Sequence, residues 1–177
     1  FADALVEDAC GHCLGRMPRP DCRPLGREVW MEGDSDRLLH ALEHLITNAQ
    51  EATPDDGFVR ITLQMVQEAS TRADELGSAG TEELKDTGSI SDDRGDQTSL
   101  ICITIEDDGC GMSREFINTR LFAPFVTTKG NSGMGIGVFE ARHVVESWGG
   151  SLEVQSTPGQ GTRFDIYLPV DTERAEA

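Results

Sequence analysis

The sequence Leu100-Ile-Cys-Ile-Thr-Ile-Glu-Asp-Asp-Gly-Cys-Gly-Met112 gives the strongest indication of how this chain folds. Its first six residues are mostly apolar and rich in isoleucine, which is typical of a buried strand. The run leads directly into Asp107, Gly109 and Gly111, so the predicted strand ends in a glycine-rich turn. A carboxylate at that point can accept a hydrogen bond from a ligand, and glycines let a ligand approach the backbone. Taken alone, however, the pattern is better explained by a tight turn that is capped by an aspartate.

Helical and extended patterns alternate on both sides of this strand. Helices are expected over residues 1–14, between Asp34 and Pro54, over 113–118 and over 138–148, and strands over 22–25, 28–31, 58–65, 100–105, 151–155 and 162–168. Asp34, Ser35 and Asp36 are N-cap candidates for the second helix. This order of elements predicts an α+β fold, a two-layer α/β sandwich in which about three helices cover one face of a mixed sheet.

Composition restricts the possible partners of the chain. A chain of 177 residues with 37% hydrophobic residues can bury a core of its own as one domain. The 15 Lys and Arg residues against 32 Asp and Glu residues give a net charge of -17, which repels nucleic acid and anionic lipid. The chain starts at Phe1 and has no apolar run long enough to cross a bilayer, so we expect a soluble fragment without membrane contact.

The cysteines are expected to be reduced thiols. Their number is odd, and the chain looks able to fold without disulfides, which favours a reducing cytosol. The five cysteines are Cys10, Cys13, Cys22, Cys102 and Cys110. Cys10-Gly-His-Cys13 matches the CxxC pattern of thiol–disulfide exchange sites, but no strand precedes it, and it continues the apolar spacing of the first helix. We therefore interpret these two cysteines as buried helix positions, with redox or zinc roles as the less favoured alternative.

Four other segments carry glycines or polar residues at suggestive positions. They are His44-Leu-Ile-Thr-Asn48-Ala-Gln-Glu51-Ala52, Leu121-Phe122-Ala-Pro-Phe125-Val-Thr-Thr-Lys129, Gly133-Met-Gly135-Ile-Gly137 and Gly159-Gln-Gly161-Thr162-Arg-Phe164. The third lies directly before a helix, where backbone N–H groups can hold phosphates even on an acidic protein. Each alone also has an ordinary explanation, such as a surface lysine or a hairpin turn. Rossmann and P-loop folds are disfavoured, because their glycine patterns are absent from the sequence.

In this order and at these separations, the five segments resemble the ATPase domain shared by histidine kinases, DNA gyrase, Hsp90 and MutL, the GHKL superfamily with the Bergerat fold. The resemblance covers about residues 34–169, and in chain order the segments correspond to the N, G1, F, G2 and G3 boxes of that family. It implies an ATP-binding catalytic domain over residues 21–170. Residues 1–20 would then end a helical linker from a missing dimerisation and phosphoacceptor domain, and residues 171–177 would form a disordered tail.

One segment departs from the family. Residues 67–98 hold nine acidic residues against three basic ones and few large apolar side chains. We expect an acidic, flexible insertion in the catalytic domain at this point.

The resemblance further implies a site for ATP and Mg²⁺. Asn48 takes the place of the asparagine that binds Mg²⁺, and Asp107 that of the acid that accepts a hydrogen bond from the adenine amine. ATP contacts are expected from Asn48, Glu51, Ala52, Asp107, Gly109, Gly111, Met112, Phe122, Thr128, Lys129, Gly133, Met134, Gly135, Ile136, Gly137 and Thr162. Catalysis is expected from Glu43, His44, Asn48 and Lys129. Gyrase-like members have a catalytic glutamate at the position of His44, and the choice of a base between Glu43 and His44 stays open.

Within the family, the residues of these motifs are most similar to those of NtrB-like kinases, with the PEP-CTERM-system type as a narrower alternative. This similarity implies the catalytic domain of a two-component sensor histidine kinase, which transfers the γ-phosphate of ATP to a histidine on a separate dimerisation domain and so serves a response regulator. None of the four histidines is followed by Glu or Asp, so we expect Mg·ATP binding without self-phosphorylation. The expected location is the cytoplasm, with the parent protein anchored in the inner membrane. A GHKL-type ATPase and a noncatalytic interaction module are the alternatives.

Overall fold

Five strands form one mixed sheet in a computed structural model of the chain, which describes residues 1–67, 99–126 and 135–170. The strands are β1 (Pro20–Arg23), β2 (Val59–Gln67), β3 (Ser99–Asp107), β4 (Ser151–Ser156) and β5 (Thr162–Pro169), in the order β1-β2-β3-β5-β4. β1 is parallel to β2, and the other neighbours are antiparallel. The mixed sheet of the predicted α+β fold is thereby confirmed.

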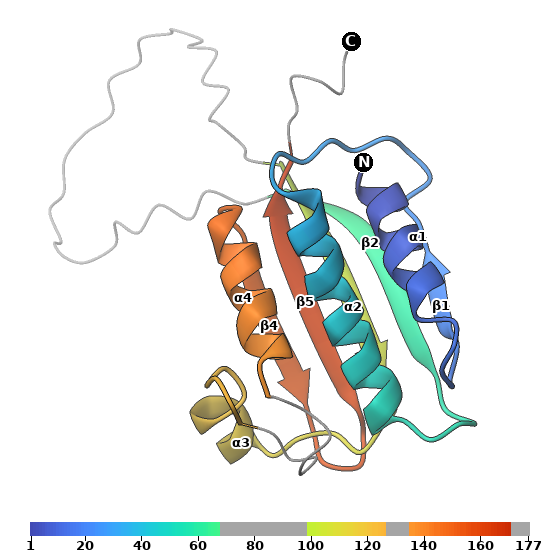
Figure 1. Cartoon of the computed structure of the whole chain (residues 1–177), viewed down its shortest axis with the longest axis vertical. Coiled ribbons are helices and arrows are strands. Elements are labelled where there is room, and N and C mark those ends of the chain that lie inside the picture. Colours follow the sequence, from blue (N-terminus) through green and yellow to red (C-terminus); the bar gives the residue numbers. More distant parts are fainter. Residues whose placement is uncertain (68–98, 127–134, 171–177) are drawn as a thin grey trace, which may run out of the picture.

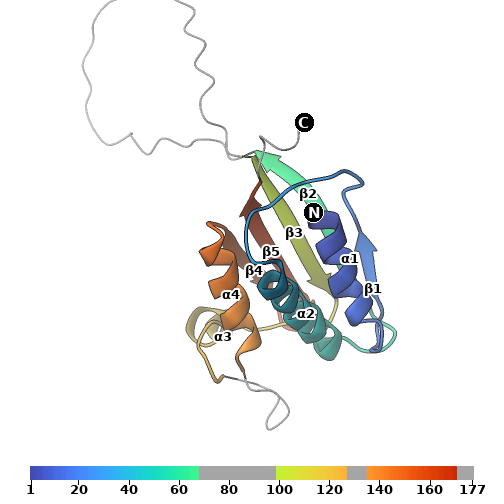
Figure 2. The same cartoon turned by 45° about the horizontal axis from the view of Figure 1, so that its top comes forward.

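Three of the four helices that the structure describes cover one side of this sheet (Figure 1). The four helices described are α1 (Ala2–His12), α2 (Ser35–Ala52), α3 (Arg114–Thr119) and α4 (Gly137–Ser147). Figure 1 shows α1, α2 and α4 side by side across one face, and Figure 2 shows the short α3 at one end of α4. Among the described residues, no helix is both long enough and apolar enough to cross a membrane.

The core lies between the helices and the sheet. Successive side chains of a strand point to opposite faces, so Ile101, Ile103 and Ile105 of β3 all face α2 and are fully buried. The apolar stripe of α2, with Leu38, Leu42, Leu45 and Ile46, fills the other half of this layer. Because Asp107 continues the alternation of β3, its carboxylate points to the same side as the core, at the end of the strand.

The opposite face of the sheet is polar and includes an ion pair between a half-exposed arginine and a buried carboxylate. Asp165 of β5 is only 2% exposed, and its carboxylate accepts hydrogen bonds from Thr104 Oγ1 at 2.6 Å and from Arg163 Nε at 2.8 Å. Burial alone would raise the pKa of Asp165, but the hydrogen bonds from Arg163 and Thr104 hold that pKa below its ordinary value. This carboxylate is therefore ionised in the folded domain.

Two predictions about the first part of the chain were wrong. Residues 28–31 form no strand, because the carbonyl of buried Val29 accepts a hydrogen bond from Ala2 N–H at 3.0 Å instead of joining the sheet. Cys10 and Cys22 are not free thiols but form a disulfide between α1 and β1. The parallel register pairs Cys22 with Ile61 and so turns it to the helix side, where it meets Cys10 of α1.

The remaining predictions for the cysteines and segment ends have mixed outcomes. Cys13 is buried, as predicted, and Cys102 and Cys110 are free, buried and exposed respectively. Asp34 is the N-cap of α2 and accepts a hydrogen bond from Arg37 N–H at 3.3 Å. The predicted insertion beyond Gln67, over residues 68–98, and the predicted tail over 171–177 lie outside the described residues.

Candidate functional site

A buried carboxylate marks one end of the sheet. Asp107 is 5% exposed, and its Oδ1 accepts a hydrogen bond from Gly109 N–H at 2.8 Å. Burial raises the pKa of Asp107, backbone hydrogen bonds from Gly109 and Thr162 act against this, and the nearby Asp108 and Glu106 charges raise the pKa further. The carboxylate therefore sits where a further hydrogen-bond donor would stabilise its ionised form.

Three loops meet around Asp107 with their backbones in contact. A Cβ atom on Gly109 would lie 2.4 Å from the carbonyl oxygen of Ala52, and one on Gly161 would lie 1.9 Å from that of Asp107. Cys110 N–H donates to the Ala52 carbonyl at 2.9 Å. The end of α2, the turn after β3 and the β4–β5 turn thus form one tightly packed floor, which only glycines permit at these positions.

Thr162 and Ser156 complete this floor. Thr162 pairs with Asp107 across β3 and β5, and its hydroxyl lies 3.0 Å from Ser156 Oγ. Ser156 Oγ also accepts from Met112 N–H and donates to the Gly161 carbonyl, both at 2.8 Å. An open surface pocket at this end of the sheet is lined by Asp107, Ser156 and Thr162, by the turn between β4 and β5, and by Glu106, Gln155 and Arg163, with no described residue of α2 or α4. Ser156 is a part of this floor that the sequence did not predict. The one feature that could have pointed to Ser156 is its pairing with Thr162 across the last hairpin.

One side of α2 connects this floor to the start of α4. His44, Asn48 and Ala52 recur every four residues, so they lie along one side of the helix. At one end of this strip, a Cβ on Gly137 would lie 3.3 Å from His44 Cβ and Nδ1. At the other end, Ala52 contacts Gly109 and Cys110. Asn48 therefore lies between the N-terminus of α4 and the floor around Asp107.

Asn48 itself is half-buried. Its side-chain amide makes no hydrogen bond within the part of the chain that the structure describes. An amide oxygen in this position can act as a ligand of a hard cation.

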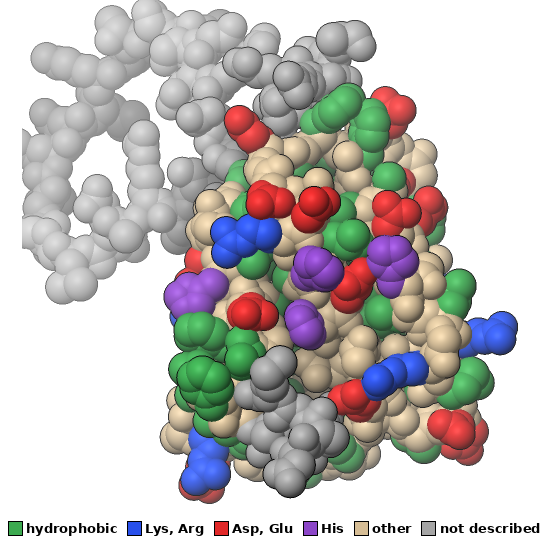
Figure 3. Space-filling view, in the orientation of Figure 1, with side chains coloured by type: hydrophobic (Ala, Val, Ile, Leu, Met, Phe, Trp, Pro, Cys, Tyr) green, Lys and Arg blue, Asp and Glu red, His purple; other side chains and the backbone are tan. Residues whose placement is uncertain are grey.

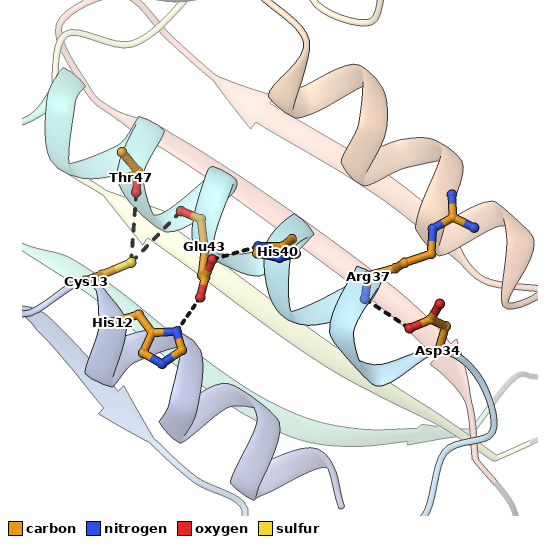
Figure 4. Close-up of polar contacts among 7 residues, drawn as sticks. All are labelled: His12, Cys13, Asp34, Arg37, His40, Glu43 and Thr47. Atoms are coloured by element: carbon orange, nitrogen blue, oxygen red, sulfur yellow. Dashed lines mark hydrogen bonds and ion pairs between the residues drawn. The ribbon is translucent and has the colours of Figure 1, made fainter.

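Glu43 lies on a different side of α2 from His44. Figure 4 shows its carboxylate between His12, at the end of α1, and His40, one turn earlier on α2. The His40 Nδ1 to Glu43 Oε2 distance is 3.1 Å. Burial acts to raise the pKa of Glu43, but the hydrogen bonds with His12 and His40 bring that pKa below its ordinary value. Figure 3 shows that histidine and acidic side chains gather on this face of the molecule, over α1 and α2.

The segment around Phe122 and Phe125 lies beside α4. The guanidinium of Arg142, on α4, stacks over the Phe122 ring at 4.7 Å from its centroid. Phe125 is 77% exposed and has a φ of 64°, which is a strained conformation for a large side chain. The backbone of Gly135 packs against this segment, because a Cβ atom on Gly135 would lie 2.5 Å from the carbonyl oxygen of Val126.

Some predicted contacts have other partners or are not described. Glu51 accepts a hydrogen bond from Arg16 Nη1 at 2.5 Å, on the α1 side of α2. Ile136 is the N-cap residue of α4. Thr128, Lys129, Gly133 and Met134 lie outside the described residues.

The family of this chain follows from a match over most of its length. The model of the family described as "Histidine kinase-, DNA gyrase B-, and HSP90-like ATPase" matches residues 33–172. The chain belongs to this family of ATPases, which confirms the resemblance seen in its motifs.

A sensor histidine kinase and a sporulation kinase are among the relatives that the chain matches. Over 146 residues it is 27% identical to the sensor histidine kinase ZraS of Escherichia coli O157:H7, which covers 82% of this chain and 25% of ZraS. It is 28% identical over 141 residues to sporulation kinase A of Bacillus subtilis strain 168, which covers 80% of this chain and 18% of that kinase. The chain thus spans a quarter or less of the length of these two relatives.

Solved structures share the fold. The mycobacterial sensor histidine kinase MprB has a TM-score of 0.62 at 20% identity, with 94% of this chain and 93% of that chain covered. Full-length ShkA in complex with AMPPNP has a TM-score of 0.63 at 20% identity, with 97% and 30% covered. These likenesses confirm the predicted fold class.

Proposed function

We propose that this chain is the ATP-binding catalytic domain of a sensor histidine kinase, which transfers the γ-phosphate of ATP to a histidine on a separate dimerisation domain. Family membership and the sensor-kinase relatives support the assignment. The observation that carries it is the buried carboxylate of Asp107, which lies in a glycine-packed floor and is connected by one strip of α2 to the start of α4.

The adenine would bind at the floor. Its exocyclic amine can donate to the carboxylate of Asp107, and this hydrogen bond would satisfy a buried acceptor whose pKa is raised by burial. Thr162 is close enough to Asp107 to contribute its hydroxyl, directly or through water. The site would therefore select adenine, because guanine has a carbonyl oxygen in place of the exocyclic amine, and that oxygen cannot donate a hydrogen bond to the carboxylate.

The phosphates would bind at the start of α4. Backbone N–H groups at a helix N-terminus are unsatisfied, and the helix dipole adds positive potential there. His44 lies against Gly137 at this point, within reach of the phosphate region. Residues Thr128, Lys129, Gly133 and Met134 are proposed contacts from the sequence motifs. A net charge of -17 is compatible with this site, because its donors are local backbone groups.

Mg²⁺ fits the donors that are present. It prefers oxygen ligands and usually takes one or two from the protein, with phosphates and water supplying the others. The half-buried amide of Asn48 can supply such an oxygen. When bound, Mg²⁺ would neutralise charge on the phosphates.

Phosphotransfer requires an incoming imidazole rather than an activated water. The acceptor nitrogen attacks the γ-phosphorus in line, the bond to the β–γ bridging oxygen breaks, and ADP leaves. Glu43 is held by His12 and His40 on the α1 side, so the strip that faces the site offers His44 and Asn48 and no carboxylate. This geometry favours a kinase over the alternative of a dedicated GHKL-type ATPase.

The wider assignments rest on this proposal. A dimerisation domain of the same protein and a response regulator are the proposed partners. The NtrB-like subgroup, the cytoplasmic location and an inner-membrane anchor in the parent protein stay predictions from the sequence.

Calorimetric titration with a nonhydrolysable ATP analogue, with and without Mg²⁺, tests the site. Asp107→Asn should weaken binding roughly 10- to 100-fold, because a hydrogen bond to a charged group contributes about 1.5–3 kcal/mol. Glu153→Gln is the control, since it removes an exposed acid of β4 that does not line the pocket at Asp107, and it should bind as the wild type does. Equal affinity of the wild type and Asp107→Asn would refute the proposed adenine contact, and a wild type that does not bind the analogue would favour a noncatalytic interaction module.

A further inference from the structure

A second side of α2 is bonded to the end of α1 and the loop that follows it. Glu43, Thr47 and Gln50 recur at four- and three-residue steps, so they form a strip of their own. Thr47 Oγ1 lies 3.9 Å from Cys13 Sγ, and Figure 4 shows this contact beside the one between Glu43 and His12. The strip toward α1 therefore runs beside the strip that holds Asn48.

Gln50 makes the most extensive of these contacts. Its side chain is 3% exposed, and Nε2 lies 3.0 Å from the Cys13 carbonyl, 3.2 Å from that of Arg16 and 3.0 Å from that of Pro18. These carbonyls belong to the C-cap of α1 and the loop that follows it, where the Cys13 carbonyl also accepts a hydrogen bond from Arg16 N–H at 3.4 Å. The two N–H groups of one buried amide are thus shared among three carbonyls of this loop.

The orientation of the Gln50 amide is set by these acceptors. A flipped amide would place its oxygen against three carbonyl oxygens, which is repulsive. In the present orientation, Oε1 is buried and has no hydrogen-bond partner among the described residues. The polar role of this side chain in the folded domain is therefore the donation by Nε2.

The other side of the same helical turn belongs to the candidate site. Gln50 lies two residues after Asn48 and two before Ala52, whose carbonyl accepts from Cys110 N–H at 2.9 Å. The last turn of α2 is thus held between the loop over residues 13–18 and the turn after β3. A shift of this turn would move Asn48 and Ala52 together, because a helix transmits rotation along its axis as a rigid element.

We propose that Gln50 is a positioning residue for nucleotide binding, which couples the loop after α1 to the nucleotide site by fixing the last turn of α2. The inference rests on the proposed function. It assigns no contact between Gln50 and the nucleotide. Because coupling between two sites is reciprocal, a bound nucleotide should in turn stabilise the loop over residues 13–18.

The test compares Gln50→Met with Ile46→Val in the full chain. Methionine has a similar length but no donors, whereas Ile46→Val removes one buried methylene of the same helix on its core side. The dissociation constant of a nonhydrolysable Mg·ATP analogue is measured far below the melting temperature of every variant, and the free energy of unfolding is measured in parallel. Gln50→Met should raise the dissociation constant about 5- to 50-fold, and Ile46→Val should leave it within about twofold.

Hydrogen exchange of the wild type gives a second readout that needs no variant. Amides of residues 13–17 should exchange more slowly when the analogue is bound, although none of them contacts it. If the wild type binds and its exchange there is unchanged, or if folded Gln50→Met binds as tightly as the wild type, the coupling is wrong while the proposed function stands. If the wild type does not bind the analogue, both the coupling and the proposed function are wrong.

Discussion

Reduction of the Cys10–Cys22 disulfide should destabilise the domain without unfolding it. The bond joins residues with a sequence separation of 12, and closing a loop of that size removes chain entropy worth about 3 kcal/mol from the unfolded state. In a domain of this size, such a loss lowers the melting temperature by roughly 10 °C. α1 should stay in place, because its buried residues Ala2, Val6 and Ala9 pack in the core independently of the bond.

Thermal and urea unfolding with and without a phosphine reductant would measure this effect. Cys10→Ala should reproduce the reduced wild type and should no longer respond to the reductant. Cys110→Ser is the control, since its exposed thiol is free and its stability should match the wild type under both conditions.

Thiol titration of the unreduced, unfolded chain decides whether the bond forms at all. Three thiols should react, those of Cys13, Cys102 and Cys110. Five reactive thiols, or a melting temperature that the reductant leaves unchanged, would refute the reasoning and restore the expectation of reduced cysteines.

Four other outcomes are expected. Gly161→Ala should weaken binding of the ATP analogue, measured by calorimetry, more than tenfold, because the new Cβ atom would lie 1.9 Å from the Asp107 carbonyl oxygen. Gly159→Ala is the control: Gly159 has a similar φ but open space around it, so the affinity should stay near that of the wild type. Binding of the analogue should weaken as the pH falls and Asp107 becomes protonated. Because the pKa of Asp107 is raised, this weakening should start at a higher pH than for an ordinary aspartate, and the ratio of wild-type to Asp107→Asn affinity should fall toward one. The pKa of Asp165 is lower in the folded domain than in the unfolded chain, so its ionised carboxylate stabilises the fold above the unfolded pKa, and this stabilisation is lost as the pH falls through the folded pKa. When the free energy of unfolding is measured against pH, Asp165→Asn should lack this loss. Incubation of the isolated chain with γ-labelled ATP should leave it unlabelled, and incorporated phosphate would contradict the absence of an acceptor histidine.

The elements that the sequence predicted well are those with strong local patterns. The apolar spacing after Asp34 predicted α2, and the apolar run from Leu100 to Ile105 predicted the centre of β3. In both, burial against the rest of the core reinforces the local preference, so pattern and packing agree. The predicted segments at the ends of α2 and β3 also meet in space, since Ala52 contacts Gly109.

The features that the sequence missed depend on contacts between distant segments. The apolar pattern of residues 28–31 suited a strand, but Val29 bonds to the start of α1. Cys22 meets Cys10 only because β1 joins the sheet in parallel with β2, which no local pattern reveals. Ser156 likewise gains its role from its partners in the turn after β3 and in the last hairpin.

The geometry of α2 bears on a choice that the sequence left open. Glu43 and His44 are adjacent, and adjacent residues on a helix point about 100° apart. His44 therefore shares a side with Asn48 and lies against Gly137, while Glu43 shares a side with Gln50 and binds His12. A carboxylate that is already engaged by two histidines is poorly placed to activate a water at the phosphates. Under the proposed function, one side of α2 serves the nucleotide and the other packs against α1, and the proposed coupling predicts that a displacement of α1 reaches the site through α2.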